Sequence, residues 1–194
     1  IVRIISGINR GRNLIDLGKG DPSASLRPTS DRVRESIFNV INVGKFGNKI
    51  ENCYILDLFA GTGALGLEAL SRGAKSVVFV DNGAQAIQFL KQNISICGVQ
   101  NKAKIIKTDA TKKLPKLSNR TFDTIFVDPP YGKGFGEQSL KILYECRLVN
   151  EETLIVLEEG HQINAIENFN ISDCRRYGSS YAHFLTINKY QSGI

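Results

Sequence analysis

The stretch DLFAGTGALG, residues 57–66, joins an apolar segment to a segment with helical spacing. It contains three glycines in the pattern GxGxxG, at Gly61, Gly63 and Gly66. Glycine permits a tight turn and lets backbone N–H groups approach a ligand closely, as in folds that bind dinucleotides. Turns of this kind also occur for packing reasons alone. The stretch therefore predicts a strand–turn–helix unit whose turn either binds a ligand or packs a helix on a strand.

Segments with strand and helix patterns alternate from residue 53 onward. Repeated strand–helix units of this kind form a parallel sheet that is covered by helices on both faces. The end of the chain breaks the alternation, because Gly178-Ser179-Ser180 separates two strand-like segments and predicts a hairpin with an antiparallel strand. The predicted fold class is α/β. Strands are expected at 54–59, 76–80, 103–107, 121–127, 153–158, 171–177 and 181–190, and helices at 64–72, 84–97 and 137–147.

The first 29 residues are irregular and rich in glycine, with short strands predicted at 2–6 and 13–16. Ser30 or Thr29 then caps a helix with apolar residues at helical spacing. We therefore divide the chain into an N-terminal β-hairpin extension, residues 1–29, and a domain of residues 30–194. Residues 1–35 carry seven basic and four acidic side chains. This balance suits an extension that docks on a polyanion such as RNA, although a solvated surface explains it equally well.

Composition restricts the class of protein. Of the 194 residues, 42% are hydrophobic and 23% are charged, which is typical of a folded domain. No apolar run reaches the roughly 18 residues of a membrane span, and the N-terminus has no secretory signal pattern. We therefore expect a cytoplasmic protein without membrane contact. Two histidines and four widely separated cysteines supply no spaced set of ligands, so no metal is expected.

Acidic residues follow two further predicted strands. Asp81 stands twenty residues after Gly61, where a carboxylate can accept from both ribose hydroxyls of a bound nucleoside. Asp109, which Ala110 follows, either accepts from the exocyclic amine of an adenine ring or caps a short helix over residues 111–114. Because the carboxyl ends of parallel strands meet at one edge of a sheet, we expect these side chains close to the glycine turn.

The motif Asp128-Pro129-Pro130-Tyr131 follows the strand predicted at 121–127. Two prolines end the strand and hold an extended, rigid backbone. The arrangement suits transfer to an exocyclic amine of a nucleobase, whose nitrogen is a poor nucleophile because its lone pair is delocalised into the ring. Asp128 and the carbonyl of Pro129 can accept from the amine, and Tyr131 can stack on a base that has left its helix. Positioning toward an electrophilic methyl group then supplies much of the rate.

Together these motifs resemble class I S-adenosylmethionine-dependent methyltransferases that act on nucleobase amines. The block RPTSDRVRESIFN, residues 27–39, is more specific and resembles the signature of the bacterial 16S ribosomal RNA guanine-N2 methyltransferases, which modify one guanine of the small subunit. The opening RIISGINRGRNL and the tail RRYGSSYAHFLTI fit the same family, so the resemblance covers nearly the whole chain. It implies a Rossmann-like domain with a mostly parallel seven-stranded sheet, an antiparallel C-terminal strand and the small N-terminal β-extension.

The resemblance also implies roles for particular residues. The implied partner is 16S rRNA, within a 30S subunit or an assembly intermediate, with no metal and no obligate protein partner. The pocket for S-adenosylmethionine would be lined by Asp57, Gly61, Gly63, Asp81, Asp109 and Ala110. The guanine would be held by Asp128, Pro129 and Tyr131, and Arg27, Thr29, Arg32 and Arg34 would lie beside the active site and contact cofactor or RNA. The basic N-terminal arm adds Arg3, Arg10 and Arg12 as predicted RNA contacts.

Four other functions share part of the pattern. A NAD-linked oxidoreductase uses the same glycine turn, but the DPPY motif and the basic N-terminus then have no explanation. A DNA adenine-N6 methyltransferase shares DPPY but generally carries a region that reads the major groove, and only 63 residues follow Tyr131. A glutamine-N5 methyltransferase would be expected to have Asn in place of Asp128. A catalytically silent RNA-binding module would not be expected to retain Asp128, Tyr131 and the full glycine turn.

Overall fold

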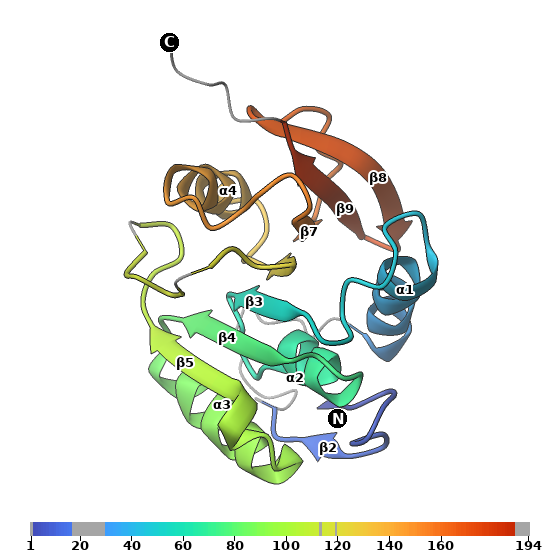
Figure 1. The fold of residues 1–194 in the computed structure, drawn as a ribbon, viewed down its shortest axis with the longest axis vertical. Helices are drawn as coiled ribbons and strands as arrows, with labels where there is room; N and C mark the ends of the chain where they lie inside the picture. Colours follow the sequence, from blue (N-terminus) through green and yellow to red (C-terminus); the bar gives the residue numbers. More distant parts are fainter. Residues whose placement is uncertain (1, 17–29, 113, 119, 189–194) are drawn as a thin grey trace.

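A computed structural model describes residues 2–16, 30–112, 114–118 and 120–188. Its main sheet contains the strands β3 (Tyr54–Leu58), β4 (Ser76–Asp81), β5 (Ala103–Lys107), β6 (Thr124–Val127), β7 (Leu154–Glu159), β8 (Phe169–Tyr177) and β9 (Ser180–Ile187). Their order in the sheet is β5-β4-β3-β6-β7-β9-β8 (Figure 1). The first five pair in parallel, and β9 runs antiparallel to both of its neighbours. The predicted α/β class, the mostly parallel sheet and the antiparallel strand near the C-terminus are confirmed.

Helices cover both faces of the sheet. The helices α1 (Asp31–Val43), α2 (Ala64–Ser71) and α3 (Ala84–Cys97) pack on one face, and α4 (Phe135–Glu145) packs on the other. Because successive side chains of a strand point to opposite faces, each strand contributes to both cores. Within β3, for example, Ile55 packs with α1, α2 and α3, whereas Leu56 packs on the side of α4. Among the residues that the structure describes, no helix combines the length and apolar character that crossing a bilayer requires.

The strand order reverses beside β3. The chain first moves outward from β3 to β4 and β5, and then returns to β6 on the other side of β3. In open α/β sheets, ligands bind outside the carboxyl ends of the strands at such a switch point. Gly61 follows β3 and Asp128 follows β6, so both sequence motifs lie at the switch point.

The N-terminal hairpin forms a separate two-stranded antiparallel sheet of β1 (Val2–Arg3) and β2 (Asn13–Leu14) beside α2 and α3 (Figure 1). Its apolar side chains join the core on the α2 and α3 side of the main sheet. The strands are shorter than predicted because the backbone N–H groups of Ile5, Ser6 and Ile15 bind outside the hairpin. Those of Ile5 and Ser6 donate to the Glu68 carboxylate of α2, at 2.7 and 3.0 Å. The predicted hairpin is confirmed, and the boundary expected after residue 29 lies outside the described residues.

Other element boundaries follow local backbone contacts. Ser30 caps α1 as predicted, with its Oγ accepting from the Val33 N–H at 3.4 Å. Helix α4 begins two residues before its predicted start, because Gly134 adopts a left-handed conformation, with φ 68°, and caps it. Strand β6 begins at Thr124 and not at residue 121, since the Phe122 N–H binds the Leu148 carbonyl at 3.2 Å instead of a neighbouring strand.

Candidate active site

The glycine turn connects β3 to α2. Phe59, just after β3, has φ 57°, a left-handed conformation that bulky residues rarely adopt and that occurs preferentially at functional sites. Gly63 precedes α2 with φ 83°, and a Cβ at this position would lie 2.5 Å from Cδ1 of Leu90. A Cβ on Gly66 would lie 2.3 Å from Cε1 of Phe79. The packing role is therefore present, since Gly66 lets α2 pack closely on the sheet and Gly63 shapes the turn. The ligand-binding role of the turn stays a prediction.

Asp81 ends β4 and lies against the glycine turn. Its Oδ2 accepts from the Gly61 N–H at 2.8 Å, and its Oδ1 accepts from the Gly83 N–H at 2.7 Å. Each carboxylate oxygen carries two lone pairs, so further hydroxyl groups can donate to it. The carboxylate supplies hydrogen-bond acceptors, and the backbone N–H groups of the glycine turn at the helix N-terminus supply donors. This combination fits the ribose of S-adenosylmethionine. The ribose contact stays a prediction.

We expect Asp81→Ala to weaken S-adenosylmethionine binding by about 1.5–3 kcal/mol, the contribution of hydrogen bonds to a charged group. Because the carboxylate also holds Gly61 and Gly83, Asp81→Asn serves as a second variant that keeps an acceptor oxygen. Calorimetry measures the affinity of each variant, and thermal unfolding checks the fold. An unchanged affinity in Asp81→Ala would refute the ribose contact.

Asp57 lies in β3 directly beneath the turn. It is 1% exposed, and its Oδ2 accepts from the Gly66 N–H at 2.9 Å. Burial raises the pKa of this carboxyl from 3.8 to about 7; the Gly66 N–H opposes the shift, and the charge of Asp81 adds to it. The carboxylate therefore positions the start of α2 in this structure. We still predict that Asp57 contributes to the cofactor pocket. It would do so indirectly, by holding the glycine turn in position.

Asp57 makes the stability of the folded chain depend on pH. Its pKa is higher in the folded state, so its contribution to stability is full below about pH 4 and is lost as the pH rises to about 7. The free energy of unfolding of Asp57→Asn should therefore rise relative to the wild type across this interval, because the amide keeps an acceptor without a charge. Urea unfolding of both proteins at several pH values measures this difference. Parallel stability curves would contradict the prediction.

Asp109 follows β5, and its side chain caps the turn after it. Oδ1 accepts from the hydroxyl of Thr111 at 2.6 Å and from its N–H at 2.9 Å. These two bonds hold the pKa of Asp109 below its usual value, and Lys112, with Nζ 3.6 Å from Oδ2, adds to the effect. The capping role is thus present, but residues 110–112 form a turn where a helix over 111–114 was expected. The contact of Asp109 with adenine stays a prediction.

Ala110 does not offer its side chain to a ligand. The residue is 3% exposed and packs in the core on the side of α4, and its carbonyl accepts from Oγ of Ser139 at 3.1 Å. A contact of the Ala110 side chain with the cofactor does not fit this position. The predicted place of the residue in the cofactor site otherwise stays a prediction.

Asn93 of α3 connects the glycine turn to the N-terminal hairpin, and the sequence interpretation missed it. The side chain is fully buried, and its Nδ2 donates to the carbonyls of Thr62 at 2.9 Å and Ile15 at 3.0 Å. Its Oδ1 accepts from the Ile15 N–H at 2.8 Å. A usable signal was present, because Asn93 falls between Leu90 and Cys97 in the apolar stripe of the helix, where an amide must find internal partners.

The DPPY motif lies at the carboxyl end of β6. Pro129 is buried and Asp128 is half-buried, whereas Tyr131 is 41% exposed. The Tyr131 hydroxyl donates to Oε1 of Glu158 at 2.7 Å, and burial together with this carboxylate raises the pKa of the hydroxyl. The chain at Gly160 approaches the ring so closely that a Cβ there would lie 3.2 Å from it. The ring is thus fixed in position while part of its surface remains accessible to a base.

Glu158, near the end of β7, is a further site residue that the sequence interpretation missed. It is 5% exposed, and the same Oε1 also accepts from Oγ of Ser180 at 3.0 Å. It therefore joins the DPPY motif to the start of β9. The signal in the sequence was the pair Glu158-Glu159 at the end of an otherwise apolar strand, where a buried carboxylate needs donors.

The arginines predicted to contact RNA have different environments. Arg3, Arg10, Arg12 and Arg32 are exposed, and Arg27 lies outside the described residues. Arg3 pairs through Nε with Asp31 at 2.8 Å, and Arg12 donates to the carbonyl of Ile96.

Arg34 is fully buried, so an RNA contact does not fit its position. Its Nη2 donates to the Arg3 carbonyl at 2.6 Å and to Oδ1 of Asp31 at 2.8 Å. Burial lowers the pKa of its guanidinium, and the charges of Asp31 and Glu68 oppose the shift. Arg34 therefore joins α1 to the N-terminal hairpin. This role corrects the sequence prediction.

Comparisons with known proteins agree with this geometry. A family described as "Conserved hypothetical protein 95" matches residues 2–186. The chain belongs to this family. It is similar to the Haemophilus influenzae ribosomal RNA small subunit methyltransferase D, with 37% identity over 81% of this chain and 78% of that protein. A Bacillus subtilis protein provisionally named rRNA methyltransferase YlbH is 38% identical over 86% of each chain.

A solved structure from Escherichia coli, provisionally named methyltransferase yhhF, superposes with a TM-score of 0.78 at 30% identity. The match covers 97% of this chain and 99% of that one. The family resemblance of the sequence and the class I methyltransferase fold are therefore confirmed.

Proposed function

We propose that this chain transfers a methyl group from S-adenosylmethionine to the exocyclic N2 of one guanine in 16S rRNA. The observation that carries the proposal is the position of the DPPY motif. It lies beside the glycine turn at the switch point of the sheet, with the Tyr131 ring fixed and partly exposed. The names of the methyltransferase D relatives support an rRNA substrate, and such a substrate places the reaction in the cytoplasm.

The residues of the chain perform three tasks in this reaction. The glycine turn with Asp81 and Asp109 holds S-adenosylmethionine, which supplies an electrophilic methyl group. Asp128 and the Pro129 carbonyl accept from the guanine amine, which makes its nitrogen a better nucleophile, while Tyr131 stacks on the ring. When bound, S-adenosylmethionine would give up its methyl group to the nitrogen, the sulfur would keep the electrons of the broken bond, and Asp128 or water would accept the amine proton. Substrate positioning supplies much of the rate, so no strong general base is required.

Incubation with S-adenosylmethionine that carries a labelled methyl group tests the proposal. Isolated 30S subunits, deproteinised 16S rRNA and duplex DNA are supplied in parallel, and Asp128→Ala serves as the control with strongly reduced activity. We expect label in 16S rRNA, with the 30S subunit or an assembly intermediate as the preferred form. Label in duplex DNA instead would favour the adenine-N6 alternative, and no label in any nucleic acid would refute the proposal.

We also propose that the N-terminal hairpin docks on RNA through its exposed arginines. Arg10 is exposed at its tip, so Arg10→Ala should reduce the slope of log K for 30S binding against log salt by about 0.7–0.9 per lost phosphate contact. The affinity for S-adenosylmethionine should not change. Binding of 30S subunits at a series of salt concentrations provides the measurement. A wild-type slope would assign the hairpin a structural role only.

A further inference from the structure

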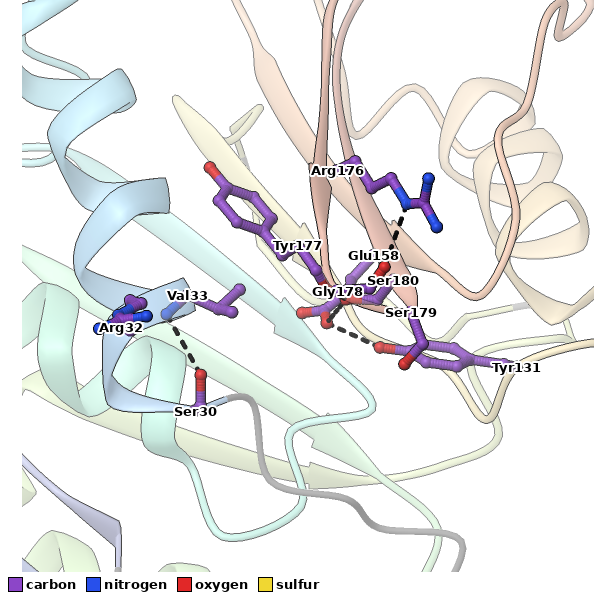
Figure 2. Close-up of a pocket in the computed structure, with 10 residues that line it drawn as sticks. All are labelled: Ser30, Arg32, Val33, Tyr131, Glu158, Arg176, Tyr177, Gly178, Ser179 and Ser180. Carbon is purple, nitrogen blue, oxygen red and sulfur yellow. Dashed lines mark hydrogen bonds between the residues drawn. The ribbon is translucent and has the colours of Figure 1, made fainter.

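A cavity of about 440 Å³ lies beside Tyr131, between the start of α1 and the turn that joins β8 to β9 (Figure 2). Ser30 and Arg32 line it from α1, and Arg176 and Ser179 line it from the turn. Its lining includes Tyr131 but no residue of the glycine turn. The cavity is therefore separate from the predicted cofactor residues and adjoins the ring on which the target base is proposed to stack.

Two exposed arginines line this cavity from different elements, Arg32 from α1 and Arg176 from β8. The Arg176 Nε donates to the Gly178 carbonyl at 3.1 Å, which holds the side chain at the turn beside the Tyr181 ring. Within the described part of the chain, no carboxylate forms an ion pair with either arginine. Guanidinium groups without an internal counterion favour an anion with several oxygen atoms, such as a phosphodiester.

The rest of the lining favours a nucleotide over a simple anion. Glu158 and Ser180 form one wall, where Oε1 of Glu158 accepts from Ser180 at 3.0 Å and from the Tyr131 hydroxyl at 2.7 Å, so this wall is polar next to the ring. Tyr177 supplies an aromatic surface, and its hydroxyl lies 2.8 Å from Oγ of Ser36, which ties β8 to α1. A carboxylate would repel a free phosphate ion, whereas a nucleotide carries both a phosphate for the arginines and polar base groups for this wall.

We propose that this cavity binds the nucleotide next to the target guanine on the same RNA strand, with its phosphate held by Arg176 and Arg32. The inference rests on the proposed function, because a guanine can reach Tyr131 only with its flanking backbone. From the sequence, Arg32 is predicted to contact RNA in general terms, whereas Arg176 and the β8–β9 turn have no predicted role. The proposal makes this turn one wall of the entrance to the active site.

Arg175 provides a matched control for Arg176. The two residues are adjacent in β8 and both exposed, so replacing either removes the same charge. Arg175 pairs with Asp173 at 3.2 Å and does not line the cavity. We compare Arg176→Ala, Arg176→Lys and Arg175→Ala with the wild type. Affinity for isolated 30S subunits across salt concentrations, KM for those subunits at saturating S-adenosylmethionine, and cofactor affinity by calorimetry are measured for each.

Arg176→Ala should raise KM for 30S subunits about 10-fold, the effect of losing a hydrogen bond to a charged group. It should also reduce the slope of log K against log salt by about 0.7, as expected for one phosphate contact on a single strand. Arg176→Lys should restore the slope because it keeps the charge, and Arg175→Ala should behave as the wild type. Cofactor affinity should be the same in all four proteins.

The outcomes separate the two proposals. Equal KM values and equal slopes in Arg176→Ala and Arg175→Ala would overturn the proposal that the cavity binds a nucleotide. The proposed function would remain intact if the wild type still methylates the RNA. If the wild type binds 30S subunits with the Arg176-dependent slope but transfers no methyl group, the proposed function fails and the RNA-binding cavity stands. If the wild type does not bind 30S subunits, the cavity proposal fails as well.

Discussion

Asp128→Ala is expected to lower kcat for methyl transfer by about 100-fold or more, which corresponds to about 2.7 kcal/mol. Loss of one preorganised polar contact to the transition state has an effect of this size. Asp128 follows β6, while the predicted cofactor residues lie in or just after β3, β4 and β5. The affinity for S-adenosylmethionine should therefore stay within a few-fold of the wild type.

Single-turnover methylation of 30S subunits at saturating cofactor measures the effect of Asp128→Ala on chemistry alone. Asp128→Asn is the matched variant, since its amide oxygen still accepts from the guanine amine, and it should retain more activity than the alanine variant. A cofactor affinity that falls as far as kcat would show that Asp128 acts in binding. The two assignments, chemistry and cofactor binding, are thus separated by one pair of measurements.

Tyr131→Ala is expected to reduce kcat/KM for 30S subunits by about 5- to 150-fold, the range that corresponds to stacking energies of about 1–3 kcal/mol per base. Tyr131→Phe should be much milder because the ring remains. The structure adds that the hydroxyl binds Glu158, so the phenylalanine variant loses one defined hydrogen bond. Equal losses in the two variants would assign the role to the hydroxyl and remove the stacking role.

A double-mutant cycle with Glu158 resolves how the ring is positioned. Tyr131→Phe and Glu158→Gln each disturb the same hydrogen bond, so the double variant should lose less activity than the sum of the two single effects predicts. Ser180→Ala is a useful comparison, because it removes the other donor to Oε1 of Glu158 without touching the ring. Additive effects of Tyr131→Phe and Glu158→Gln would show that the contact does not position Tyr131 for the reaction.

The sequence was sufficient for features that depend on local spacing. The glycine turn, the acid after β4 and the motif after β6 each follow a strand end, and strand ends are visible as changes in hydrophobic periodicity. The parallel sheet follows from the alternation of these strands with helices. The hairpin of β8 and β9 was visible from Gly178 between two strand-like segments.

The sequence was insufficient where a role depends on contacts between distant segments. The Tyr131–Glu158 bond joins residues 27 positions apart, and it requires β7 to lie beside β6. Asn93 likewise bridges Ile15 and Thr62, which no local pattern connects. Thr111 was expected in a short helix but lies in a turn, where Asp109 accepts from its N–H.

The helical spacing of Arg34 indicated that it is buried, but its positive charge outweighed this signal in the prediction. Its positive charge grouped it with the other arginines of the N-terminal region. Its spacing from Ile37, Phe38 and Ile41 places it on the buried face of α1, and all four side chains are 1% exposed or less. A charged residue in an apolar stripe indicates an internal partner, which here is Asp31 together with the Arg3 carbonyl.

The central claim, methyl transfer to a guanine amine, is tested most directly by nucleoside analysis of the product. The chain is incubated with S-adenosylmethionine and 30S subunits that lack the modification, and the 16S rRNA is then digested and analysed by mass spectrometry. We predict N2-methylguanosine from a single position, formed about 100-fold more slowly or slower still when Asp128→Ala replaces the wild type. N6-methyladenosine, or N2-methylguanosine that Asp128→Ala forms at the wild-type rate, would contradict the account.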